Sequence, residues 1–74
     1  MTKKKFDLDI HIRLAEEIYK LDISNVELAK RLNCNPTNVR NWLSGANLPY
    51  AYYLAGFHRV GCDVIYILTG ERHV

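Results

Sequence analysis

The chain has 74 residues, 49% of them hydrophobic, and its 10 Lys and Arg against 8 Asp and Glu give a formal net charge of +2. A chain this short holds at most one domain, and this much apolar material predicts a globular core rather than a disordered chain. Its longest apolar stretches are too short to cross a bilayer, and no signal-peptide hydrophobic region follows residues 1–5. We therefore expect a soluble, cytoplasmic protein without a membrane partner.

Gly, Pro, Asn and Ser residues divide the chain into about five short helical segments, with no internal repeat and weak strand signals. From about Asp9 to Leu21, apolar residues recur at helical spacing opposite a charged face, which predicts the first helix. Ser24 followed three residues later by Glu27 is a capping-box pattern, in which each side chain satisfies a backbone donor at the helix start, and it predicts that a second helix opens near Asn25.

The second helix is expected to end at residue 32 and to lead into a tight turn. Asn33 suits the left-handed backbone conformation that ends a helix, and Cys34 completes the turn. Asn35 is suited to cap the next helix and Pro36 to occupy its first position. This third helix is predicted to end before Gly45.

The last third of the chain predicts a loop over residues 46–49 and two more helices. The fourth helix covers residues 50 to about 59, is followed by Gly61 as terminator, and carries Ala51, Leu54, Ala55 and His58 along one side. Asp63 is expected to cap a short last helix that runs through residue 68 and is closed by Gly70. We divide the chain into a flexible basic arm (1–7), one all-α domain (8–70) and a tail (71–74).

The third helix has two different faces. Val39, Trp42 and Leu43 fall on one arc, and Thr37, Asn41 and Ser44 on the opposite arc, with Asn38 and Arg40 flanking them. Asn can pair bidentately with adenine and Arg with guanine, and the Thr methyl can contact thymine. We therefore expect Thr37, Asn38, Arg40 and Asn41 to read base edges. Short polar residues also cover the outside of any amphipathic helix, and the net charge alone does not indicate nucleic-acid binding.

Residues 24–45 contain Glu27-Leu28-Ala29, Val39 and Asn41-Trp42-Leu43-Ser44-Gly45, and Pro49 follows. This combination resembles the helix-turn-helix of the lambda-repressor-like (XRE, Cro/C1-type) family. The segment Gly61-Cys62-Asp63-Val64-Ile65-Tyr66-Ile67-Leu68-Thr69-Gly70 is similar to the ending of phage C1-type repressor domains, so the resemblance covers about residues 8–70. Asn33 departs from the family's more frequent Gly, and Pro36 stands where some relatives carry a base-reading Gln.

The resemblance implies a compact five-helix domain that binds double-stranded operator DNA through a helix-turn-helix at its second and third helices. It implies a transcriptional regulator, a phage or prophage repressor, that binds a pseudo-palindromic operator as a homodimer. The start of the second helix, with Asn25, would contact the DNA backbone, as would Ser44, Gly45 and Asn47 after the third helix. Lys3, Lys4 and Lys5 form either an arm that attracts phosphates or a solvated tail.

The last helix carries five consecutive apolar or aromatic residues, 64–68. Either the core and the tail enclose it, or it forms a two-fold dimer contact through Ile65, Tyr66 and Leu68, which we favour. An alternative function uses the same surface: an antitoxin or other protein-interaction module in which this helix and a cluster of Tyr50, Tyr52 and Tyr53 hold a protein partner.

The sequence offers no pattern typical of a metal, cofactor or catalytic site, so we expect neither an enzyme nor a bound cofactor. Cys34 and Cys62 lack the paired spacing of a zinc site and are expected to be reduced. His11, His58 and His73 lack partner spacing. Arg59 and Arg72 are expected to be solvated surface charges.

Overall fold

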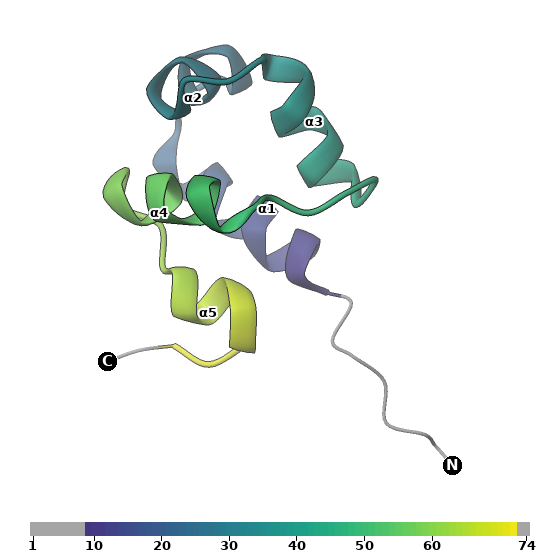
Figure 1. Ribbon diagram of the computed structural model, residues 1–74. Helices are drawn as coiled ribbons and strands as arrows, with labels where there is room; N and C mark the ends of the chain where they lie inside the picture. The colour runs from purple at the N-terminus through teal and green to yellow at the C-terminus, as the bar shows by residue number, and fades with distance from the viewer. Residues whose placement is uncertain (1–8, 73–74) are drawn as a thin grey trace.

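The computed structural model describes residues 9–72, which form five α-helices and, within that range, no strand (Figure 1). The helices are α1 (Ile10–Leu21), α2 (Asn25–Leu32), α3 (Pro36–Ser44), α4 (Ala51–Arg59) and α5 (Val64–Thr69). The all-α class is therefore confirmed, and each helix lies within one or two residues of its expected bounds. The expected basic arm with Lys3, Lys4 and Lys5, and His73 in the tail, lie outside the described residues.

Local capping explains where α2 begins. The Ser24 hydroxyl accepts a hydrogen bond from the backbone N–H of Glu27 at 3.0 Å, as the capping-box pattern predicts. The second half of that prediction is wrong, because the Glu27 carboxylate accepts from Nε of Arg31 at 3.0 Å instead of returning to the backbone of residue 24. A cation one helical turn away competes successfully for an exposed carboxylate.

The turn between α2 and α3 has the expected geometry. Asn33 adopts the left-handed conformation at φ 60°, and the N–H of Cys34 donates to the carbonyl of Ala29 at 2.9 Å. Asn35 Oδ1 then accepts from the N–H of Thr37 at 2.8 Å, so the next helix is capped from its first turn. Three residues therefore connect the two helices, and the end of α2 and the start of α3 are both capped by hydrogen bonds.

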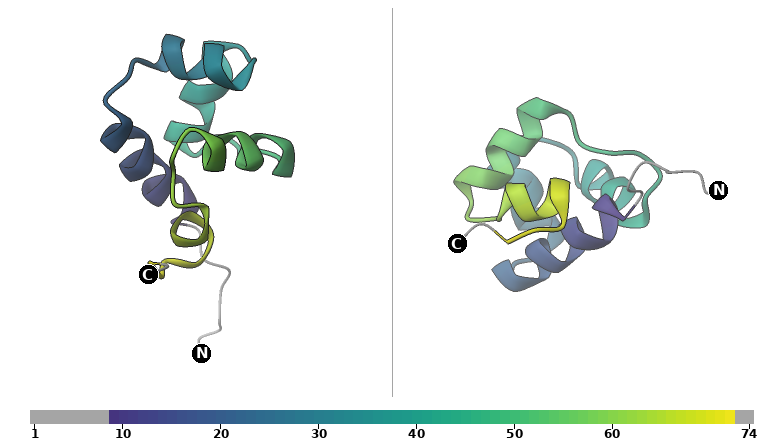
Figure 2. Two further views of the ribbon diagram at one scale, coloured as in Figure 1. Left: turned by 90° about the vertical axis from the view of Figure 1, so that its left-hand side faces the viewer. Right: turned by 90° about the horizontal axis from the view of Figure 1, so that it is seen from below.

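The core is one apolar cluster to which every helix contributes. α1 contacts both α3 and α5, while α4 contacts α2 and α5. In the ribbon views, α5 lies at the opposite end of the molecule from α2 (Figures 1 and 2). The indole of Trp42 lies at its centre, edge-on to Phe57 with ring centroids 5.6 Å apart. The buried side chains are Leu14, Ile18, Leu28, Ala29, Leu32, Val39, Trp42, Phe57, Cys62 and Ile67.

The inner face of α4 differs from the side picked out in the sequence. Phe57 is fully buried and Gly56 packs against Leu32 of α2, whereas Ala51, Ala55 and His58 are exposed and Leu54 is half-buried. The side chain of Phe57 fills the space beneath Trp42, and the absence of a side chain at Gly56 allows α2 to approach α4 closely. The side that carries Leu54 and Ala55 instead borders a groove against α5.

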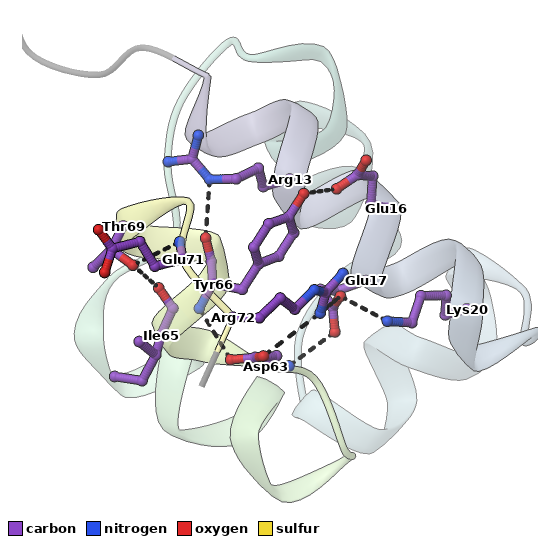
Figure 3. Close-up of polar contacts among 10 residues, drawn as sticks. All are labelled: Arg13, Glu16, Glu17, Lys20, Asp63, Ile65, Tyr66, Thr69, Glu71 and Arg72. Carbon is purple, nitrogen blue, oxygen red and sulfur yellow. Dashed lines mark hydrogen bonds and ion pairs between the residues drawn. The ribbon is translucent and has the colours of Figure 1, made fainter. Parts of the chain in front are cut away.

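The tail residue Arg72 lies on the surface, 46% exposed, as expected, but it also makes ion pairs that the sequence did not indicate. Its Nη1 lies 2.7 Å from Glu17 Oε2 and 3.5 Å from Asp63 Oδ2, and its guanidinium carbon lies 3.8 Å from the centre of the Tyr66 ring (Figure 3). No short-range pattern marks a pair separated by 55 residues, which is why the sequence did not indicate it. Arg59 is exposed as expected.

The apolar residues of α5 divide between the inside and the outside. Ile67 is fully buried, Val64 and Tyr66 are half-buried, and Ile65 and Leu68 remain 51% and 41% exposed. Within residues 9–72, no helix combines the length and the apolar character needed to span a membrane.

Candidate nucleic-acid interface

The outer face of α3 carries the residues expected to read base edges. Val39 and Trp42 are buried on the inner face and fix the rotation of the helix. Thr37 and Arg40 are exposed and Asn41 is half-buried on the opposite side. Arg40 Nη2 donates to Thr37 Oγ1 at 3.1 Å, so these two side chains lie side by side. The fold therefore presents Thr37, Arg40 and Asn41 together, away from the core.

Asn38 lies at the edge of this face rather than at its centre. It is half-buried beside Trp42, and its side chain hydrogen-bonds the thiol of Cys34. Burial raises the pKa of Cys34, and this hydrogen bond partly offsets the effect. Asn38 therefore connects the outer face of α3 with the turn before it.

The loop after α3 closes against α1 through Gly45. This glycine has φ 84°, and a Cβ in its place would lie 3.1 to 3.2 Å from the imidazole of His11. The Ser44 hydroxyl donates to the carbonyl of Asn41 at 3.1 Å and accepts from the N–H of Ala46 at 3.3 Å. Gly45 and Ser44 are both exposed, so the loop offers its backbone to a ligand at the end of α3.

Two of the side chains expected to contact the DNA backbone, Asn25 and Asn47, flank α3 on opposite sides. Asn25, at the start of α2, borders the same shallow hollow as Leu43. Asn47 borders a different hollow of about 280 Å³, together with Asn38 and Tyr50. The outer face of α3 thus has an asparagine on either side of it.

Tyr50 is a candidate that the sequence did not indicate for this face, since we assigned it only to a tyrosine cluster. It is 76% exposed and lies beside Asn38 and Asn47 at the start of α4. The sequence signal that places it there is Pro49, which ends the loop just before the helix. Its hydroxyl is a further hydrogen-bond donor next to α3.

The tyrosine cluster forms as expected, whereas the expected dimer contact is divided by the fold. The ring of Tyr53 lies 6.3 Å from that of the exposed Tyr50 and 5.1 Å from that of the exposed Tyr52, and it also packs on Trp42 at 5.0 Å, all measured between ring centroids. Ile65 and Leu68 lie beside a groove of about 700 Å³ between α4 and α5. The hydroxyl of Tyr66 is directed to α1, where it donates to the Glu16 carboxylate.

Neither cysteine lies in a setting that activates a thiol. Cys62 is buried, and burial, reinforced by the charge of Glu17, raises its pKa to about 11. Both cysteines are free, as expected. Over residues 9–72, no three His, Cys, Asp or Glu side chains come together as metal ligands would.

Comparisons with protein-family models, with curated proteins and with solved structures find no match for this chain. The chemistry of the α3 face is therefore assigned from its own residues.

Proposed function

We propose that the chain is a sequence-specific double-stranded DNA-binding protein that inserts α3 into the major groove. The observation that carries this proposal is the outer face of α3, where Thr37, Arg40 and Asn41 lie together over a buried anchor of Val39 and Trp42. The major groove admits an α-helix, and these three side-chain types match the groups on its base edges.

The surroundings of α3 support the same function. Asn25 on one side and Asn47 on the other can bind phosphate oxygens and fix the position of the helix, as can the exposed loop at Ser44 and Gly45. Such contacts orient a protein without reading sequence. The α2–turn–α3 arrangement then acts as a helix-turn-helix, as the sequence resemblance implies.

The regulatory role that follows is that of a Cro/C1-like repressor that acts as a dimer. One short module makes few base contacts, so two copies on a pseudo-palindromic operator increase both affinity and specificity. The half-sites are expected roughly 10 bp apart, centre to centre. Exposed Ile65 and Leu68 are available for the contact between the copies.

The experiment is a selection of bound sequences from random duplex DNA, followed by titration of the selected duplex against a scrambled one at near-physiological salt. We expect an inverted repeat that binds at least about a thousandfold more tightly than scrambled DNA. A single unpaired half-site would contradict the dimer, and the absence of any enriched sequence would contradict DNA reading altogether.

A protein-interaction module is the second candidate, because Tyr50 and Tyr52 are exposed and the groove beside Ile65 and Leu68 is mainly apolar. In that case a co-purifying protein would cover these residues. Substitution Tyr52→Ala distinguishes the two functions, since it would weaken the protein complex but leave selected-DNA binding unchanged.

A further inference from the structure

We propose that the ion pair of Arg72 with Glu17, called the latch below, keeps α5 docked on α1. When this ion pair breaks, α5 is released as a unit and the groove between α4 and α5 changes shape. The contacts that carry this inference join the tail, α1 and α5, and none of them lies on the outer face of α3 (Figure 3). The inference is therefore independent of DNA binding.

α5 depends on its neighbours for its helical structure. It has only six residues, and isolated helices of this length are unstable in water. Among its side chains only Ile67 is fully buried. Apolar burial alone therefore stabilises the docking of α5 on the core only weakly, and polar contacts supply the remaining stabilisation.

One side of α1 binds both ends of α5. Near the C-terminal end, Arg13 Nε donates to the carbonyls of Tyr66 at 2.9 Å and Ile67 at 3.0 Å. At the N-terminal end, Glu17 Oε1 accepts from the backbone N–H of Asp63 at 2.9 Å. Because Arg13 and Glu17 are one helical turn apart on α1, they hold α5 as a pair.

Arg72 completes this attachment from the tail. It is bonded to Glu17 and Asp63 and lies over the ring of Tyr66, so one side chain contacts α1, the residue that caps α5, and α5 itself. Glu17 is only 3% exposed, whereas its two cations are partly solvated: Arg72, at 2.7 Å, is 46% exposed and Lys20, at 3.1 Å, is 59% exposed. Removing Arg72 leaves a buried carboxylate with less compensation, which disfavours the docked state.

The opposite side of α5 forms a wall of the groove. Val64, Ile65 and Leu68 face Leu54 across it, and the buried Cys62 lies at its edge. Because the same short helix is held by the latch on one side and lines the groove on the other, release of the latch changes the groove. It also exposes the Cys62 thiol, which provides a chemical reporter of opening.

The test uses the full chain with Cys34→Ala, so that Cys62 is the one remaining thiol. Arg72→Ala is compared with Arg31→Ala, a matched control that removes an exposed Arg–Glu pair on α2. We expect Arg72→Ala to accelerate alkylation of Cys62 by N-ethylmaleimide at least about tenfold, whereas Arg31→Ala leaves the rate unchanged. Arg72→Lys, which keeps the charge, is expected to be intermediate.

Native-state hydrogen exchange separates local release from general destabilisation. The latch predicts faster exchange for the α5 amides while those of Leu28 and Val39 keep their protection. Equal alkylation rates in Arg72→Ala and Arg31→Ala would overturn the proposal. Faster exchange throughout all five helices would also overturn it, because α5 would then not open as a unit.

Discussion

At the scale of single residues, Asn41 is the most direct test of the α3 face. It is half-buried on the outer face of α3, directly before the buried Trp42 in the chain. We expect Asn41→Ala to weaken binding to the selected duplex by about 1–3 kcal/mol, because one bidentate base contact is lost. Binding to scrambled DNA should barely change. Titration of both duplexes measures this, and an equal loss on both would remove Asn41 from the reading residues.

The residues of the α3 face could be predicted from sequence because one nine-residue helix contains both its anchors and its outer side chains. Asn38 was expected to flank this face and lies at its edge. Tyr50 could not be placed in the same way, since its position beside Asn38 and Asn47 depends on the path of the loop between α3 and α4. Arg72 was missed for a related reason: its partner Glu17 is remote in sequence, and neither residue belongs to a local pattern.

At the scale of elements, the crossing of α2 and α4 depends on Gly56. A Cβ at this position would lie 2.7 Å from Cδ2 of Leu32, which is itself buried. We expect Gly56→Val to lower the free energy of unfolding by about 1–3 kcal/mol through overpacking. The matched control is Ala55→Val, one residue earlier and exposed, which should cost less than about 1 kcal/mol. Urea denaturation measures the free energy of unfolding of both variants. Equal losses would show that α2 and α4 move apart at little cost, and would contradict the prediction.

The elements themselves were predictable because caps and terminators are local signals. Asn35 and Asp63 cap their helices through side-chain oxygens, and Gly45 and Gly70 adopt positive φ where the helices end. The inner face of α4 was not predictable from its spacing, because both of its sides carry apolar residues. The inner face is defined by the packing of Phe57 against Trp42, a residue of another helix.

At the scale of the whole molecule, Glu17 makes stability depend on pH. Burial acts to raise its pKa, but the N–H of Asp63 and the side chains of Arg72 and Lys20 outweigh this and lower the pKa below its ordinary value. The Glu17 carboxylate therefore binds a proton more readily in the unfolded chain than in the folded one. The resulting stabilisation is fully present above about pH 4.3, the ordinary value for glutamate, and is lost as the pH falls through the lowered folded value.

We therefore expect Glu17→Gln to lower the free energy of unfolding at pH 7 and to flatten its fall between about pH 5 and pH 3. Glu27→Gln is the control, because Glu27 takes part only in the exposed pair with Arg31. Urea denaturation at several pH values provides the measurement. If the Glu17→Gln profile ran parallel to that of the unchanged chain, the buried carboxylate would not be a source of the acid sensitivity.

Trp42 is the single tryptophan of the chain, and it lies within α3, buried against Tyr53 and Phe57. Tryptophan fluorescence of the chain therefore comes from a single site, directly beneath the outer face of the helix. The emission wavelength and intensity of this fluorescence depend on whether the indole ring is shielded from water. The protein thus carries its own optical label for the packing of α3 on the core, and unfolding can be followed without attaching a dye.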